Sequence, residues 1–280
     1  MKIENIEKLL DWENNGMNMA VDGQFLYIQS SLDMYKFDLA SLDLAAQTPI
    51  FEKDGKARGF SIFGDLIFLH DFLDLYILSK DTLEIRDKLR LGENVSSDVN
   101  GVMWFEAPKA YVKIRNGWIY VLDINTKETH KIQVNESSFW SHCVTKDRLY
   151  AGTVKGELLE IDKGSLAVLR KIQLCKKNIY SVVHEDGLLY TISQDQSIKA
   201  VDAASFETVR ENAKAVVGIV EIAGMYGDSL IVTGGRVSVS EWDKQTLRKR
   251  RELDFTKDLI IHGNRLFGHN RQGVYTARQG

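Results

Sequence analysis

Two short runs of the sequence combine residue types that perform acid–base or nucleophilic chemistry, His70-Asp71 and Ser141-His142-Cys143. A histidine oriented by a carboxylate can act as a general base, and a histidine beside a serine or cysteine can activate it as a nucleophile. Adjacent residues of a β-strand point to opposite faces, so neither run brings its groups together unless a loop does so. We therefore interpret both runs as ordinary strand or loop residues and expect no catalytic residue.

The other residues with metal or cofactor chemistry give no binding pattern. The histidines lack the close spacing of metal ligands, and no phosphate-cradling motif accompanies Gly59 or the Gly234-Gly235 pair. The two cysteines, Cys143 and Cys175, fit free thiols in a reducing compartment better than a disulfide. We expect neither a cofactor nor a bound metal.

Charge and hydropathy exclude further classes of partner. A formal net charge of −3 over 280 residues gives no bulk attraction to nucleic acid or to an anionic membrane. The basic run 248–251 stands beside Glu252 and Asp254, so we interpret it as a solvated edge strand. No apolar run approaches the roughly 18 residues of a membrane span. The first ten residues carry acidic groups where a signal peptide is apolar, and we expect a cytoplasmic protein.

The elements that position these residues are indicated by a six-fold repeat. An apolar run ends in an acidic or small residue, and a hydroxyl residue follows three positions later. Successive copies lie 41, 44, 39, 40 and 41 residues apart. A period of about 40 residues with several short strands per unit is typical of propeller blades. The pairs are Asp38 with Ser41, Ser79 with Thr82, Asp123 with Thr126, Asp162 with Ser165, Asp202 with Ser205, and Asp243 with Thr246.

One unit can be divided into four strands by its alternation and turn residues. We predict strands at Ile179–Glu185, Leu188–Ser193, Ser197–Val201 and Phe206–Glu211, with Asp-Gly as the first turn. The turn after the third strand contains the repeated Asp and Ser, whose oxygens can accept backbone N–H groups. The repeated pairs are therefore expected to be structural.

Seven second-strand cores recur along the chain, one more than the turns. We predict a single all-β domain over residues 1–280, a seven-bladed β-propeller of four-stranded antiparallel blades; six blades is the alternative. The last unit ends after its third strand, so the N-terminal segment Ile3–Leu10 is expected to complete it and to remove an exposed sheet edge. A short amphipathic helix is the competing interpretation of that segment.

Parts of these units resemble known repeats. The stretch from Ser193 to Asp202, SQDQSIKAVD, resembles the end of a WD repeat, and Trp242-Asp243 is a literal Trp-Asp. The stretch from Leu149 to Asp162 looks more like a quinoprotein-type propeller repeat. The Gly-His pair of the WD repeat is missing, so the Asp–His hydrogen bond of that family is not carried over to Asp195. The resemblance implies a divergent WD-repeat-like or quinoprotein-like propeller.

Propellers of this kind usually bind through loops that precede the inner strand and follow the second strand. Trp, Tyr and Arg dominate binding hot spots. We interpret the protein as a non-enzymatic module whose loops bind a protein or peptide. The alternative is a small-molecule or sugar-binding propeller, or a hydrolase or lyase with a cation-assisted site at the central channel. A competing interpretation of Trp140 and Tyr180 is packing between blades. The candidate binding residues are Arg58, His70, Asp71, Arg115, Trp140, Tyr180, Arg236 and Arg271.

Overall fold

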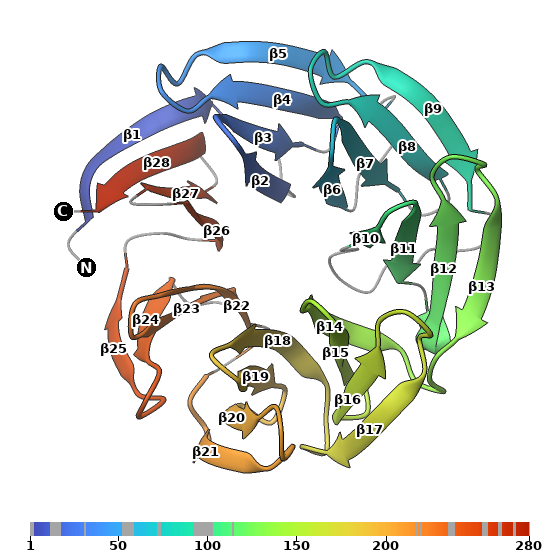
Figure 1. The fold of residues 1–280 in the computed structure, drawn as a ribbon. Helices are drawn as coiled ribbons and strands as arrows, with labels where there is room; N and C mark the ends of the chain where they lie inside the picture. Colours follow the sequence, from blue (N-terminus) through green and yellow to red (C-terminus); the bar gives the residue numbers. More distant parts are fainter. Residues whose placement is uncertain are drawn as a thin grey trace. The chain divides into compact units, whose positions relative to one another are not determined.

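The protein is built almost entirely of β-strands. The computed structural model describes residues 3–11, 18–30, 32–51, 59–71, 74–91, 103–113, 115–216, 218, 220–234, 239–253, 257–262, 265–270 and 273–279. These residues form strands β1 to β28 and one 3-10 turn, η1 (Arg115–Gly117), and the strands pair into seven four-stranded sheets (Figure 1). The expected all-β class is confirmed. Within the described residues, no helix is long and apolar enough to cross a membrane.

Three sheets come from the first half of the chain, and each consists of four consecutive antiparallel strands. The first contains β2 (Asn18–Asp22), β3 (Phe25–Gln29), β4 (Asp33–Asp38) and β5 (Leu44–Pro49). The second contains β6 (Gly59–Phe63), β7 (Leu66–His70), β8 (Asp74–Ser79) and β9 (Ile85–Arg90). The third contains β10 (Met103–Glu106), β11 (Lys109–Lys113), β12 (Trp118–Asp123) and β13 (Thr129–Gln133).

Three more sheets repeat this plan. The fourth contains β14 (Phe139–Val144), β15 (Arg148–Thr153), β16 (Glu157–Asp162) and β17 (Val168–Gln173). The fifth contains β18 (Ile179–Glu185), β19 (Leu188–Ser193), β20 (Ile198–Asp202) and β21 (Thr208–Asn212). The sixth contains β22 (Val220–Tyr226), β23 (Ser229–Gly234), β24 (Ser240–Asp243) and β25 (Lys249–Glu252).

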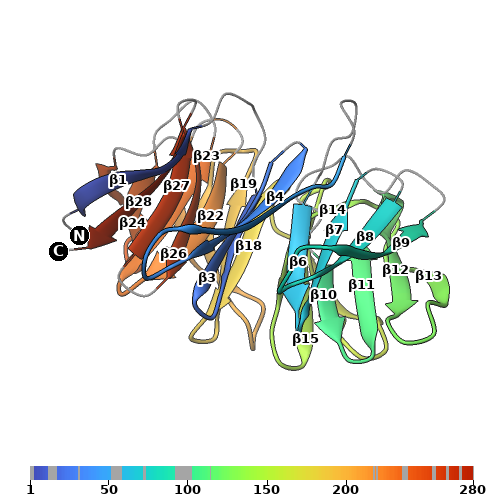
Figure 2. The same ribbon diagram turned by 90° about the horizontal axis from the view of Figure 1, so that it is seen from above.

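The remaining sheet joins the two ends of the chain. Its strands are β26 (Lys257–His262), β27 (Arg265–Asn270), β28 (Gly273–Gln279) and β1 (Ile3–Asp11). The last three strands of the chain stand beside β1, which is hydrogen-bonded to β28 (Figure 2). The expected strand at Ile3–Leu10 is confirmed, and the helical interpretation of that segment is wrong.

This connectivity corrects the expected count of seven blades. Six blades are of the repeated kind, four consecutive antiparallel strands, and they run from β2 to β25. The last unit supplies only three strands, so it forms no such blade by itself. Its fourth strand comes from the opposite end of the chain, where β1 occupies the place of an outer strand. The structure therefore contains six repeated blades and one composite sheet.

The chain divides into two compact units. One comprises residues 8–133 and 271–274, and it contains the blades β2–β5, β6–β9 and β10–β13. The other comprises residues 1–7, 134–270 and 275–280, and it contains the blades β14–β17, β18–β21 and β22–β25.

Burial follows strand position within each blade. The second strands are flanked by neighbours on both edges and are apolar on both faces, as in Leu26, Tyr27 and Ile28, all fully buried. The outer strands instead alternate between exposed and half-buried residues. Apolar packing between neighbouring blades of one unit therefore comes from the inner, second and third strands, while the outer strands meet solvent.

The predicted strands of the fifth blade match the structure closely. β18 and β19 have the expected bounds, and Asp186 and Gly187 both have positive φ, 50° and 76°, as a two-residue hairpin turn requires. The outer strand begins at Thr208 instead of Phe206. Phe206 has a φ of 65°, so it still belongs to the turn.

The repeated Asp and Ser/Thr pairs close the turns between third and fourth strands. In each complete turn the carboxylate accepts the backbone N–H of the hydroxyl residue, as Asp202 does from Ser205 at 2.7 Å. The hydroxyls of Ser41, Thr82, Thr126, Ser165 and Ser205 in turn accept a backbone N–H two residues later, as Ser205 does from Glu207 at 3.3 Å. In all six copies the next residue has a φ between 52° and 65°. The structural role expected for the repeat is confirmed.

These hydrogen bonds also lower the pKa values of the turn carboxyl groups. A backbone N–H from the hydroxyl residue holds the pKa of Asp38, Asp123, Asp162 and Asp202 below its usual range. The guanidinium of Arg250 and the backbone N–H of Thr246 lower the pKa of Asp243 to about 2.

We expect acid to remove this contribution to stability. The folded-state pKa of Asp243 lies below its unfolded value of 3.8, so its stabilisation is present above about pH 4 and is lost as the pH falls toward about 2. Asp243→Asn keeps an oxygen for the two backbone N–H groups but removes the charge beside Arg250. The variant should be less stable than wild type at neutral pH, and the difference should shrink between pH 4 and pH 2 in urea denaturation. Asp147→Asn, an exposed carboxylate outside these turns, is the control; a difference that stays constant with pH would contradict the prediction.

Cationic and amide side chains connect some of these turns to the preceding blade. Lys36 Nζ donates to the backbone oxygen of Asp81 at 3.0 Å, and Asn212 Nδ2 donates to that of Leu247 at 2.6 Å. Arg170 donates to the backbone oxygens of Ala203 and Ala204 at 2.8 and 2.7 Å. Backbone oxygens of these turns therefore accept hydrogen bonds that hold neighbouring blades together.

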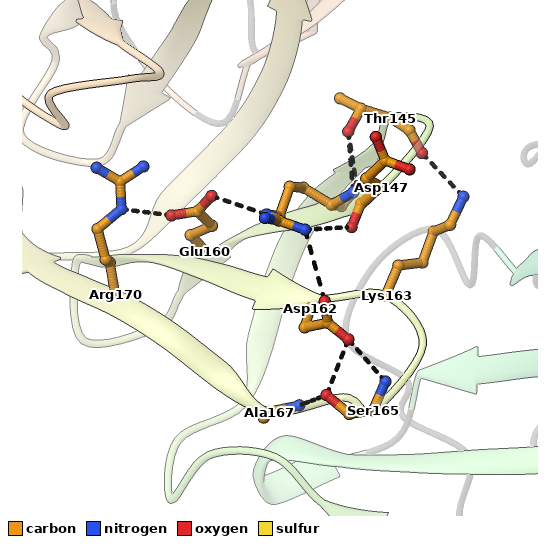
Figure 3. Close-up of polar contacts among 9 residues, drawn as sticks. Thr145, Asp147, Glu160, Asp162, Lys163, Ser165, Ala167 and Arg170 are labelled. Atoms are coloured by element: carbon orange, nitrogen blue, oxygen red, sulfur yellow. Dashed lines mark hydrogen bonds and ion pairs between the residues drawn. The ribbon is translucent and has the colours of Figure 1, made fainter.

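The fourth blade contains a buried carboxylate held between two arginines (Figure 3). Glu160, only 6% exposed, accepts hydrogen bonds from Arg148 Nε at 3.1 Å and from Arg170 Nε. Arg148 also reaches Asp162 at 3.5 Å. The guanidinium of Arg170 lies 4.6 Å from the ring centre of Phe206. Glu160 therefore positions the arginine that contacts the turn of the fifth blade.

Candidate interaction face

Three of the candidate binding residues, His70, Asp71 and Arg115, lie at or shortly after the end of a strand. His70 ends β7 and is fully buried, with its Nδ1 atom 3.1 Å from the backbone oxygen of Asp71. The Asp71 carboxylate instead accepts the backbone N–H of Asp74 at 2.7 Å. Arg115 begins the turn η1 between β11 and β12. Arg58, Arg236 and Arg271 lie outside the described residues.

Trp140 and Tyr180 are brought together by neighbouring inner strands. Trp140 lies on β14 and Tyr180 on β18, and their ring centres are 5.4 Å apart with planes tilted by 57°. Tyr180 is 5% exposed, whereas Trp140 is half-buried. The two strands are also linked by Ser141 Oγ, which donates to the backbone oxygen of Ile179 at 3.1 Å. The pair packs between the fourth and fifth blades, with Trp140 as its more accessible member.

The run Ser141-His142-Cys143 lies within β14, as the strand interpretation expected. Burial raises the pKa of the Cys143 thiol to about 12, so the thiol is protonated at neutral pH. Cys143 and Cys175 are both free thiols. Among the described residues, no group of three or more His, Cys, Asp or Glu side chains is arranged to hold a metal ion.

Loops of the second unit form a continuous surface that we call the loop face. It comprises residues 134–138, 154–156, 174–178, 194–197 and 213–216, which precede inner strands or follow second strands. Main-chain hydrogen bonds connect these loops to one another. They run from Val154 N to Ser138 O at 3.0 Å, Leu174 N to Gly156 O at 3.0 Å, Gln194 N to Asn178 O at 2.8 Å, and Ala215 N to Gln196 O at 2.7 Å.

Side chains fix the conformation of the loop 194–197. One carboxylate oxygen of Asp195 accepts hydrogen bonds from the hydroxyls of Ser193 at 2.6 Å and Ser197 at 2.7 Å, and from the backbone N–H of Ser197 at 3.1 Å. Burial raises the pKa of Asp195, but these hydrogen bonds outweigh it and leave the pKa below its usual range. Asp195, the residue that matches the WD-type loop aspartate, thus acts within its own loop.

A close backbone contact fixes the loop 154–156 against its neighbour. Gly156 has a φ of 81°, and a Cβ at this position would lie 2.3 Å from the backbone oxygen of Cys175 and 2.6 Å from that of Lys177. Only glycine fits such a contact. Gln173 Nε2 donates to the backbone oxygens of Lys155 and Cys175 at 2.8 and 2.5 Å. The loops 154–156 and 174–178 are therefore held as one piece of backbone.

Four exposed lysines on the loop face were missed as candidate residues: Lys155, Lys176, Lys177 and Lys214. Sequence reasoning concentrated on arginines and aromatic residues. The available signal was the adjacent pair Lys176-Lys177 in a loop between an outer and an inner strand.

Comparison with known proteins identifies the fold. No family model matches the chain, and no curated protein matches it significantly. A chain of the mitotic checkpoint complex is 14% identical, with a TM-score of 0.76, covering 99% of this chain and 91% of that one. The β-propeller domain of Cps50 (Swd1) from Myceliophteria thermophila is 13% identical, with a TM-score of 0.72, covering 94% and 99%. BamB from Moraxella catarrhalis is 15% identical, with a TM-score of 0.64, covering 95% and 84%.

At these identities the likeness concerns the fold alone. These neighbours confirm the expected β-propeller fold.

Proposed function

We propose that this protein is a non-enzymatic interaction module whose loop face binds a protein or peptide partner. The propeller fold and its neighbours, one of which belongs to the mitotic checkpoint complex, support this class of function. The cytoplasmic location expected from the sequence is part of the proposal.

The proposal rests on a contrast between the loop face and the turns that connect the other ends of the strands. We call the turns at 145–147, 162–167, 185–187, 202–207, 226–228 and 243–248 the turn face. In its three repeated turns the carboxylate accepts the backbone N–H of the hydroxyl residue. The hydroxyls of Ser165 and Ser205 accept a backbone N–H, and that of Thr246 donates to Asp243. The loop face differs from blade to blade, and its exposed side chains stand on a backbone already fixed by hydrogen bonds between loops. A surface ordered in advance loses little conformational entropy on binding.

Bulky substitutions on each face test this proposal. Glu136→Tyr with Gln194→Tyr places two large side chains at exposed positions of the loop face. Lys146→Tyr with Glu207→Tyr does the same on the turn face and is the matched control. We expect affinity capture from source-cell lysate, quantified by mass spectrometry, to recover the same partner with wild type and the turn-face variant. The loop-face variant should lose it.

Unchanged melting temperatures would show that both variants are folded. Recovery of the same proteins by all three forms would contradict the proposal, as would loss of the partner from the turn-face variant alone.

A further inference from the structure

Among the described residues, the four lysines of the loop face form no ion pair, whereas several other cations of their unit contact an acidic side chain or a backbone oxygen. On the turn face, Lys163 donates to the backbone oxygen of Thr145 at 3.0 Å, and Lys244 pairs with Glu185. On the strands, Lys171 pairs with Glu157 at 3.1 Å. Within the described part of the chain, the ammonium groups of Lys155, Lys176, Lys177 and Lys214 form neither an ion pair nor a hydrogen bond.

The backbone holds these lysines near one another. Lys155 precedes Gly156, whose contact with the carbonyls of Cys175 and Lys177 places the two loops in direct contact. Lys214 precedes Ala215, whose N–H donates to Gln196 O at 2.7 Å, and Gln194 N donates to Asn178 O in the adjoining loop. The lysines therefore follow a connected path across the loops of the fourth and fifth blades.

The turn face, which includes turns of the fourth to sixth blades, and the loop face, which covers residues 134 to 216 in five loops, carry opposite net charge. The turn face contains eight acidic and four basic residues, whereas the loop face contains the four lysines and two acidic residues, Glu136 and Asp195. The charge on Asp195 already receives three hydrogen bonds within its loop. The loop face thus presents positive potential on a protein whose net charge is −3.

We propose, as a deepening of the proposed function on which it rests, that the loop face binds an acidic, extended segment of a partner protein. The lysines Lys155, Lys176, Lys177 and Lys214 provide the charge, and the exposed amides of Gln194 and Gln196 suit hydrogen bonds to a peptide backbone. Nucleic acid is disfavoured by the net negative charge and by the small number of cations, because its affinity comes from many phosphate contacts.

Charge reversal on each face provides the test. The loop-face variant is Lys155→Glu, Lys176→Glu and Lys177→Glu, and the control is Lys109→Glu, Lys146→Glu and Arg248→Glu. All six residues are exposed, and both variants change the net charge equally. The probes are a fluorescent peptide of alternating Glu and Ser, its Lys-Ser counterpart, and a labelled single-stranded oligouridine. Fluorescence anisotropy is measured for full-length protein at low and at physiological salt.

We expect wild type and control to bind the Glu-Ser peptide, and the loop-face variant to bind it about tenfold or more weakly. Affinity should fall with added salt, since the charges are exposed. Equal loss in the control would overturn the proposal in favour of bulk charge. Tighter binding of oligouridine, lost in the loop-face variant, would overturn it in favour of a nucleic-acid surface. Absence of peptide binding by wild type would overturn it outright.

Affinity capture from lysate distinguishes failure of the acidic-segment proposal from failure of the proposed function as an interaction module. If the charge-reversed variant retains a partner that the Glu136→Tyr, Gln194→Tyr variant loses, the interaction module stands and the acidic-segment proposal fails. If neither variant loses any partner, both proposals fail.

Discussion

Replacement of Gly156 by alanine should destabilise the protein by about 3 kcal/mol or more. The alanine would adopt a φ near 81°, which costs an L-residue about 1–2 kcal/mol, and its Cβ would lie 2.3 Å from the carbonyl oxygen of Cys175. That oxygen belongs to the backbone, so it can move only if the loop moves. Urea denaturation of purified wild type and variant measures the change in free energy of unfolding.

Gly187→Ala provides the matched control. Gly187 has a similar φ of 76°, but no atom lies within 4 Å of its added Cβ. Its loss should therefore be about 1 kcal/mol, the cost of the backbone conformation alone. Equal losses at the two positions would show that the contact between the loops 154–156 and 174–178 contributes nothing.

Replacement of Glu160 by alanine should have the next largest effect, a loss of about 2–3 kcal/mol. The side chain is buried and separates two guanidinium groups, those of Arg148 and Arg170. Its removal leaves two like charges facing each other without their shared carboxylate. The partial exposure of both arginines keeps the loss below that of a fully buried ion pair. Thermal and urea unfolding measure the effect.

A double-mutant cycle with Arg170→Ala isolates the interaction. Arg170→Ala alone also removes the hydrogen bonds to Ala203 and Ala204 and the contact with Phe206. If Glu160 stabilises the protein through Arg170, the loss caused by Glu160→Ala should be smaller in the Arg170→Ala background. Strict additivity of the two losses would contradict this coupling.

The scaffold could be predicted from the sequence wherever local signals specify it. The Asp-Gly turn at 186–187 and the Asp202 turn depend on residues within a few positions of one another. The start of β21 was missed by two residues because Phe206, an apolar residue typical of strands, adopts a positive φ in the turn and is 5% exposed. Burial of the Phe206 ring in the folded protein outweighs the preference of phenylalanine for β-strands.

The candidate site was predicted less completely. The sequence predicted that binding takes place on the loops before inner strands and after second strands, which differ from blade to blade. Trp140 and Tyr180 lie instead on the inner strands β14 and β18 beside this face, where they contact each other between the fourth and fifth blades. The lysines were overlooked because exposed cations are ordinary in any sequence. Lys171 and Lys177 look alike in the chain, but Glu157 neutralises only Lys171.

The sequence by itself determined the period of the repeat, the turns that close each unit and the divergent propeller fold, because alternation and side-chain-to-backbone hydrogen bonds act over a few residues. The tertiary structure decided what depends on distant segments. Pairing of β1 with β28 joins the two ends of the chain, and it leaves six repeated blades and one composite sheet. The positive charge of the loop face has the same origin, since a lysine is neutralised or left exposed only by groups that other strands and loops bring near it.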